Sequence, residues 1–272
     1  MPLKLTLVAA MPSKVESGWN EGEVEMHQKL HVPDHGNPTA SGLPQRYHGR
    51  IMQSPLLALG TLDDEGRPWT TVWGGERAFA RPIAEDVLGL NSTVSRFDPV
   101  FQTLWGDQRD SSSSDTVVEM NRLMSGLSID PETRDRVKLI GDAIAGAVVD
   151  DERVQLAFHI SGSLGNCPKY ITRREIVPHD VEAAVLEAEG TTNTGGLHLG
   201  EAARRVLDQA DLFFMSTTDG ESMDTNIRGG KPGFVRVLRN EDDVVELVYP
   251  ECTSSLLAAC ILYHYLEIRW LT

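Results

Sequence analysis

The chain has 272 residues, of which 40% are hydrophobic and 24% charged, so it can form one large or two modest globular domains. Its formal net charge of −15 repels phosphate backbones and anionic bilayers, which argues against nucleic acid and membrane surfaces as partners. No apolar run approaches the roughly 18 residues of a membrane span. The three cysteines, Cys167, Cys252 and Cys260, are too few and too widely spaced for a disulfide framework, which predicts a reducing, cytoplasmic location.

Residues 1–50 form a lead-in to the first domain. One short helix is expected over Glu21–Leu30, and Asn37–Gln45 is a loop by composition. Three histidines and an aspartate gather in this region, but the spacing H-x-x-D-H matches no common metal site and proline and glycine interrupt any helix that would align the ligands. We therefore expect a polar loop and no metal at these residues, which are His27, His31, Asp34 and His35.

The chain carries an internal repeat, which is the strongest signal in the sequence. Shifted by 155 residues and without a gap, Leu57–Arg81 aligns with Leu212–Arg236. The shared pattern is GG-x-x-x-F-x-R. The identical positions are Leu57, Thr70, Gly74, Gly75, Phe79 and Arg81 in the first copy, and Leu212, Thr225, Gly229, Gly230, Phe234 and Arg236 in the second. Two copies indicate a duplicated domain rather than a solenoid.

Each copy predicts the beginning of a small antiparallel barrel. A short apolar run, Leu56–Leu59 or Leu212–Met215, is a candidate buried strand. An acidic turn with glycine follows, at Asp63–Gly66 or Asp219–Gly220, and is typical of a hairpin. A polar strand, a Gly-Gly break and a further strand with Phe and Arg come next.

Five further elements are expected between the two copies. Strands are expected at Val87–Leu90, at Val137–Val149 with bends at its glycines, and at Arg153–Ile160, where apolar and polar residues alternate with a period of two. Asp98-Pro99 indicates a helix start before Trp105. Apolar residues at helical spacing predict another helix, and these are Val117, Met120, Leu123, Met124 and Leu127.

The boundary between the two domains falls near residue 190. Helices are expected at Val181–Glu189 and at Glu201–Ala210, on either side of a loop rich in glycine and threonine. We assign residues 51–190 to the first unit and residues 191–272 to the second.

Most enzyme signatures are absent from the sequence. It has no P-loop, no G-x-G-x-x-G after a strand, no G-x-S-x-G, no H-E-x-x-H and no C-x-x-C, which weighs against nucleotide hydrolases, Rossmann dehydrogenases, serine hydrolases and zinc sites.

In the second copy, Arg228 and Lys231 bracket two glycines and can hold a phosphate, while Thr225 and Asn226 offer hydrogen-bonding groups. A solvated hairpin turn is the alternative interpretation.

A second basic constellation follows the strand that ends near Ile160. Cys167 lies between Asn166 and Lys169, and two arginines follow shortly after. Positive neighbours lower the pKa of a thiol and make it reactive. The alternative, which we favour, is a half-buried cysteine in a basic turn.

With these residues the chain resembles the pyridoxamine 5′-phosphate oxidase-like, FMN-binding split-barrel proteins, in a branch with two units in tandem. The similarity is spread over about residues 17–250. The stretches that carry it are Trp19–Glu23, Ser54–Gly75, Arg136–Leu139, Leu164–Tyr170, Ala210–Phe214 and Met223–Leu238. The resemblance implies an α+β fold of tandem antiparallel split β-barrels with flanking helices.

The resemblance also implies a homodimer with FMN at its interface. On that reading Thr225, Asn226 and Arg228 line the flavin, Lys231 adds charge, and the loop Asn166–Lys169 borders the same pocket. It implies a flavin-dependent oxidoreductase for a small organic substrate, and some relatives carry a reductase module.

The end of the chain departs from the family pattern. After Glu251 the sequence shows little similarity, so the second barrel is expected to be incomplete. An open sheet edge is costly to expose. The tail then covers it, as an apolar helix over Ser255–Leu266, or a partner does. A second hypothesis follows, in which the protein is a non-catalytic accessory or ligand-binding protein with a degraded flavin site.

Overall fold

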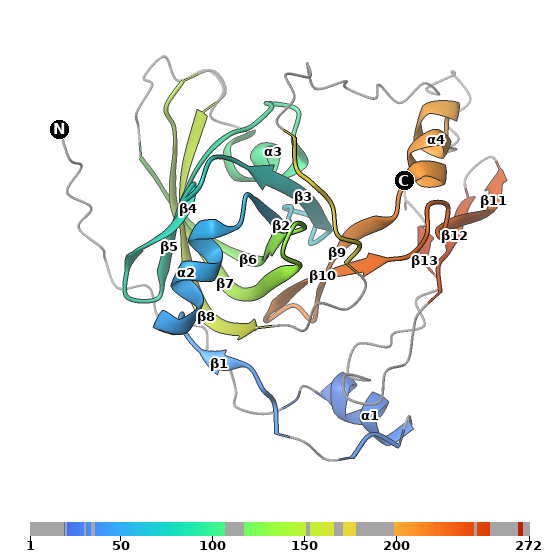
Figure 1. Ribbon diagram of the computed structural model, residues 1–272, viewed down its shortest axis with the longest axis horizontal. Coiled ribbons are helices and arrows are strands. Elements are labelled where there is room, and N and C mark those ends of the chain that lie inside the picture. Colours follow the sequence, from blue (N-terminus) through green and yellow to red (C-terminus); the bar gives the residue numbers. More distant parts are fainter. Residues whose placement is uncertain are drawn as a thin grey trace. The chain divides into compact units, whose positions relative to one another are not determined.

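The computed structural model describes residues 19, 21–29, 31–33, 36–106, 117–150, 153–165, 171–177, 199–241 and 244–250, and the backbone of 266–268. Within these residues the fold is α+β, with antiparallel sheets and four helices (Figure 1). The helices are α1 (Glu21–Lys29), α2 (Gln45–Gln53), α3 (Pro99–Trp105) and α4 (Glu201–Gln209). The helix expected at Val181–Glu189 lies outside the described residues.

The described chain divides into two compact units. The first contains residues 39–106, 117–150, 153–165 and 214–226, and the second contains the remaining described residues. The strands β9 (Leu212–Thr218) and β10 (Met223–Gly229) form a hairpin, and the tip of this hairpin belongs to the first unit. A piece of the second repeat copy is therefore part of the unit that the first copy builds.

One antiparallel sheet makes up most of the first unit, in the strand order β3-β2-β6-β7-β8-β5-β4. The bounds of its strands are β2 (Leu56–Leu62), β3 (Pro68–Gly74), β4 (Ala80–Ala84), β5 (Val87–Thr93), β6 (Val118–Asp130), β7 (Asp135–Val148) and β8 (Arg153–Gly165). The short β1 (Ala40–Ser41) pairs with β8. The Ser92 hydroxyl of β5 donates to the Gly74 carbonyl of β3 at 2.6 Å, so the sheet curls until β5 approaches the end strand β3.

The interior of this barrel is apolar because alternate strand residues point inward. In β8, Val154, Leu156, Phe158 and Ile160 are all at most 3% exposed, as the period of two predicts. Helix α3 begins at Asp98, whose carboxylate accepts from the amides of Val100 and Phe101, which confirms the expected helix start.

The apolar stripe beginning at Val117 does not form the expected helix; that prediction is wrong. Residues 118–130 are strand β6, paired with β2 on one side and β7 on the other. The second half of this strand, Met124–Ile129, is buried on both faces, so it shows no alternation between apolar and polar residues. A register shift between Glu119 and Arg122 further obscures the period of two in the first half.

The second repeat copy reproduces the elements of the first. Helix α2 and strands β2, β3, β4 and β5 have their counterparts in α4, β9, β10, β11 (Arg236–Glu241) and β12 (Val244–Val248). Strands β11 and β12 pair, as β4 and β5 do. The backbone of β13 (Leu266–Ile268) continues that sheet beside β12. Leu266 is thus in a strand, and the rest of the helix expected from Ser255 lies outside the described residues.

The turn that contains Gly-Gly has the same geometry in both copies. A Cβ atom on Gly75 would lie 2.6 Å from the Cβ of Phe79, and one on Gly230 would lie 2.7 Å from the Cβ of Phe234. Real Cβ atoms do not approach so closely, which explains why the pattern GG-x-x-x-F needs its second glycine. The Phe79 amide donates to the Glu76 carbonyl at 3.0 Å, and the Phe234 amide to the Lys231 carbonyl at 2.9 Å.

The two copies differ in how their helices are covered. Ile51 of α2 is fully buried in the first unit, where α2 packs against β4, β6 and β7. Val206 occupies the equivalent position of α4 and is 54% exposed. Among the described residues, the second copy thus lacks the strands that cover this face in the first.

The repeated turn yields a test of backbone strain. Ala78 has φ +65° and its counterpart Gly233 has φ +76°, a region that side chains disfavour. Ala78→Gly should therefore stabilise the protein by up to about 1 kcal/mol, and Gly233→Ala should destabilise it by about as much. Denaturant unfolding measures both changes; equal midpoints for the two variants and the wild type would contradict a shared turn.

Candidate functional site

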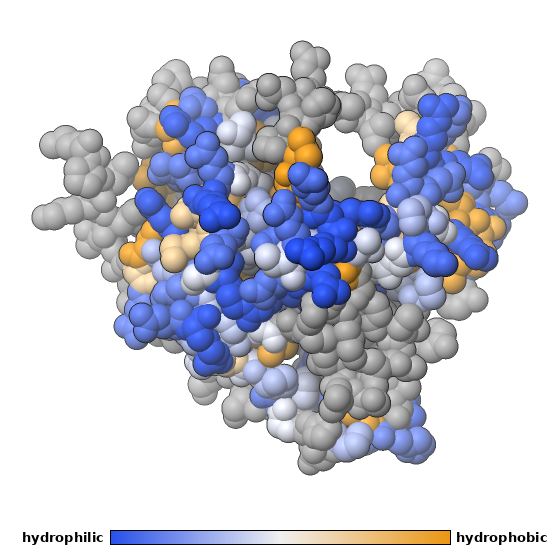
Figure 2. Space-filling view, viewed as in Figure 1, coloured by the Kyte–Doolittle hydropathy of each residue, from blue (hydrophilic) through white to orange (hydrophobic). Residues whose placement is uncertain are grey.

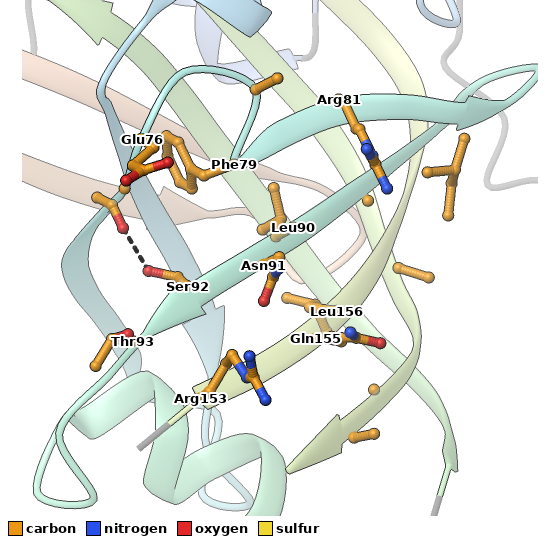
Figure 3. A pocket seen from close by; sticks show the side chains of 18 of the residues that line it. Glu76, Phe79, Arg81, Leu90, Asn91, Ser92, Thr93, Arg153, Gln155 and Leu156 are labelled. Carbon is orange, nitrogen blue, oxygen red and sulfur yellow. Dashed lines mark hydrogen bonds between the residues drawn. The ribbon is translucent and has the colours of Figure 1, made fainter. Parts of the chain in front are cut away.

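The repeat motif of the first copy lines a cavity of about 770 Å³ on the first unit (Figure 3). All four of its defining residues, Gly74, Gly75, Phe79 and Arg81, contribute to the wall. The remaining wall comes mainly from strands β4, β5, β7 and β8. This volume lies within the range of roughly 300–1,000 Å³ that small-molecule and cofactor sites occupy.

The register of the strands arranges the floor of the cavity in rows. The first row runs across β4, β5, β8 and β7, through Arg81, Gly89, Ala157 and Ala145. The Ile83 side chain lies over Gly89, 2.7 Å from where a Cβ atom would stand. The row therefore offers small apolar groups at Ala157 and Ala145 beside Ile83, with the Arg81 guanidinium at one end.

The next two rows add polar groups. One contains Asn91, Gln155 and Ala147, and the other pairs Thr93 with Arg153. Along β8 the first and third rows are four residues apart, which corresponds to about 13 Å. Figure 3 shows the amides of Asn91 and Gln155 between Arg81 and Arg153. The arrangement suits an elongated molecule with a flat ring, hydrogen-bonding edges and an anionic end.

The cavity is cationic although the chain as a whole is acidic. Its described wall holds three guanidinium groups, from Arg77, Arg81 and Arg153, against the single carboxylate of Glu76. Arg153 pairs with Asp150 at 3.0 Å, whereas Arg77 and Arg81 form no ion pair with any described residue. Arg81 is therefore the cation best placed to receive an anionic ligand. Elsewhere, the described residues on the face in Figure 2 are mostly hydrophilic.

The residues predicted in the second copy lie in two different places. Thr225 is fully buried in the first unit, and its hydroxyl bonds those of Ser125 at 2.7 Å and Ser216 at 2.9 Å. This hydroxyl is thus engaged on both sides and shielded from solvent, and its role beside a cofactor stays a prediction. Its neighbour Asn226 donates to Asp224 at 3.0 Å.

Arg228 and Lys231 belong to the second unit. Arg228 is 8% exposed and donates to the carbonyl of Ile227 at 3.1 Å, while Lys231 is exposed. Their role in binding a cofactor stays a prediction. Asn166, Cys167 and Lys169 lie outside the described residues, so their predicted place beside the same pocket is untested.

The repeat motif of the cavity is visible in the sequence, whereas the wall opposite it is not. Arg81 was part of the repeat pattern, yet the phosphate site was expected in the copy with more cations. Arg153 and Gln155 appeared only as the polar face of an alternating strand. The available signal was that this face carries Arg, Gln and Ala in succession, which is unusually small and cationic for a solvated strand face.

A second cavity of about 650 Å³ lies beside helix α3, between aromatic side chains that include Trp69, Phe97 and Trp105. Its charged groups are already paired. Asp63 accepts hydrogen bonds from the Trp69 indole at 2.9 Å and the Arg67 guanidinium at 2.7 Å. Arg122 bonds Asp64 at 2.8 Å. The charged side chains of this cavity are therefore less available to a charged ligand than those of the first cavity.

Comparison with known proteins gives distant matches only. No family model and no curated protein matches the sequence. Among solved structures, a putative pyridoxamine 5′-phosphate oxidase of Lactobacillus delbrueckii is similar over 46% of this chain and 95% of its own, at 11% identity and a TM-score of 0.30. An F420 reductase is similar over 45% and 98%, at 12% identity and a TM-score of 0.27. Likenesses at these scores carry no argument about this chain.

Two kinds of feature are absent from the part of the chain that the structure describes. No helix there is long and apolar enough to cross a membrane. No group of three or more histidine, cysteine, aspartate or glutamate side chains there could hold a metal ion. His27 instead packs edge-on against the Trp19 ring, with the ring centroids 4.7 Å apart.

The turn beside the second cavity predicts a pH dependence. Burial raises the pKa of Asp63, but hydrogen bonds from Trp69 and Arg67 outweigh it and lower the pKa to about 2. A lowered folded-state pKa stabilises the protein above the unfolded-state value near 4, and this stability is lost as the pH falls toward 2. Asp63→Asn should therefore lower the free energy of unfolding at pH 7, and its difference from wild type should shrink between pH 4 and pH 2.

The neighbouring Asp64→Asn is the matched control, because Asp64 is 79% exposed and pairs only with Arg122 among the described residues. Exposed pairs contribute at most about 1 kcal/mol. Denaturant unfolding at several pH values distinguishes the two. An Asp63→Asn variant as stable as wild type at pH 7 would show that the hydrogen bonds do not stabilise the turn.

Proposed function

We propose that the first unit binds a phosphate-bearing flavin, FMN, in the cavity lined by its repeat motif. The observation that carries this proposal is a row of small residues beside Ile83 and next to a row with two amide side chains. The same cavity wall holds Arg77 and Arg81, which form no ion pair with a described residue. The floor suits one face of a tricyclic ring, and the amides of Asn91 and Gln155 suit its polar edge. Arg81, joined by Arg77, suits the phosphate, since guanidinium binds phosphate in a bidentate manner.

The chemistry of the cavity supports a role for a cofactor. Glu76 is the one carboxylate on the described wall, and the other charged groups there are arginines, which keep their charge. The wall therefore offers little acid–base catalysis of its own. A bound flavin supplies hydride or electron-pair transfer at its N5 atom, and the protein binds and orients it.

On this basis the protein is a flavin-dependent oxidoreductase acting on a small organic substrate, with electrons exchanged through a separate reductase partner. The role of the chain's own residues is to hold the ring against Ala157, Ala145 and Ile83 and to neutralise the phosphate with Arg81. The loop from Gly75 to Phe79 forms one side of the cavity, and its tight turn fixes the backbone position of Arg77.

A second candidate is a non-catalytic accessory or ligand-binding protein. This role is favoured by the same observation, that the described cavity wall has few groups able to act as an acid or a base. Such a protein would use the cavity to bind a small anion without redox chemistry. Purified protein that is yellow and releases FMN supports the oxidoreductase, whereas colourless protein that takes up no added FMN supports the accessory role.

The sharper test compares equivalent arginines of the two copies. Arg81→Gln should raise the Kd for FMN about 10-fold to 100-fold, because one charge-assisted hydrogen bond to phosphate contributes about 1.5–3 kcal/mol. Arg236→Gln changes the matching position of the second copy and should leave the Kd unchanged. Titration of the apoprotein with FMN, followed by quenching of flavin fluorescence, measures both.

A third variant, Arg228→Gln, tests the site expected from the sequence. A large loss of affinity in this variant, with none in Arg81→Gln, would contradict the first-unit site and place the flavin at the Gly-Gly turn of the second copy. Thermal unfolding of each variant without FMN checks that the differences arise from binding and not from loss of the fold.

A further inference from the structure

The hairpins of the two repeat copies meet inside the first compact unit. Strands β2 and β3 belong to the sheet of that unit, and the tip of the β9–β10 hairpin packs against them (Figure 1). The contact is made by small polar side chains. Its members are Thr70 of β3, Ser125 of β6, Ser216 of β9 and Thr225 of β10.

One hydroxyl joins the two copies. Ser216 accepts a hydrogen bond from the Thr70 hydroxyl at 2.8 Å, and its own amide donates to the Thr70 oxygen at 3.1 Å. The same Ser216 hydroxyl bonds Thr225 at 2.9 Å. Ser216 is 6% exposed and Thr225 is fully buried, so these bonds are shielded from water.

A glycine permits this close approach. Gly60 stands opposite Thr70 in the β2–β3 ladder. A Cβ atom at Gly60 would overlap the Ser216 hydroxyl and lie 2.7 Å from the Ser216 Cβ and 2.8 Å from the Thr225 hydroxyl. No other residue fits here without moving the second-copy hairpin.

The residues that meet are equivalent positions of the repeat. Thr70 and Thr225 align in the two copies, and both bond the same serine, which itself aligns with Thr61. An isologous contact would also pair Thr225 with Thr61, but the Thr61 hydroxyl donates to the Leu123 carbonyl at 3.0 Å, so the hairpins meet at Ser216 without that reciprocal bond. We propose that the second-copy hairpin takes the place of a partner within one chain, so that the second copy serves as the built-in partner of the first.

An ion pair beside the hydroxyl contact selects the second copy as that partner. Lys138 of β7 is only 7% exposed and pairs with Asp224 of β10. The position equivalent to Asp224 in the first copy is Trp69. A first-copy hairpin from another chain would therefore not offer Lys138 this carboxylate, and the loss of a buried ion pair is destabilising.

This interface changes the expected assembly. The resemblance to split-barrel proteins implies a homodimer, but here the face around Gly60 is already occupied by the chain's own second hairpin. The protein is then a monomer in which an internal contact replaces the one between subunits. The inference does not depend on the proposed flavin site, since none of the four hydroxyl residues lines the cavity.

A cysteine cross-link tests whether the contact forms within one chain. In a background with Cys167, Cys252 and Cys260 replaced by serine, Thr70→Cys is combined with Ser216→Cys. Hydroxyl oxygens 2.8 Å apart place the two side chains close enough for a disulfide after small adjustment. Mild oxidation should cross-link most molecules at the mass of a single chain, 30.0 kDa.

The control pair is Thr71→Cys with Ser216→Cys. Thr71 points to the opposite face of β3, where its hydroxyl bonds Asp98, so this pair should not cross-link. Intact-mass spectrometry after oxidation separates the outcomes. A 70–216 bond found in covalent dimers, or no more cross-linking than in the control, overturns the proposal.

Light scattering of the unmodified protein gives an independent result. A single-chain mass at micromolar concentration is expected. A mass of two chains would overturn the statement that the second copy takes the place of a partner subunit, whether or not the cross-link forms.

Discussion

The missing side chain at Gly60 is the constraint on which the arrangement depends. It lets the second-copy hairpin come close enough for Ser216 to bond Thr70 and Thr225 at the same time. Each such hydrogen bond contributes only about 1 kcal/mol, but breaking one inside a buried cluster leaves the partners unsatisfied and costs more. The hairpin also covers the outer side of β6, which explains why half of that strand is buried on both faces.

One ancestral pattern has acquired two uses in this chain. In the first copy the turn GG-x-x-x-F-x-R lines a cationic cavity backed by β5, β7 and β8. In the second copy the same turn forms, with Phe234 packed over Gly230. The described residues supply no counterpart of β6 and β7, and only the three-residue β13 pairs with β12 where β8 pairs with β5. The hairpin of that copy instead completes the first unit. The repeat thus contributes both to the candidate site and, through the hairpin, to the packing on β3 and β6.

Much of the fold could be predicted from the sequence where local patterns decide it. The repeat, the Asp98 helix start and the alternation of β8 each depend on neighbours along the chain. The prediction failed for β6, because burial on both faces removes the period of two and leaves apolar residues at helical spacing. The cavity could not be predicted because its rows join Arg81, Gly89 and Ala157, whose adjacency exists only once the strands are paired. For the same reason the bond between Thr225 and Ser125, one hundred residues away, could not be predicted.

The central claim is that the second repeat copy folds onto the first through the contact at Gly60. Native-state hydrogen exchange of wild type and Gly60→Val measures this directly, because the amides of residues 214–226 report on the hairpin and those of β7 and β8 report on the barrel. The account predicts that valine removes protection from the hairpin while β7 and β8 keep theirs. A hairpin equally protected in both proteins, beside an unchanged barrel, would contradict it.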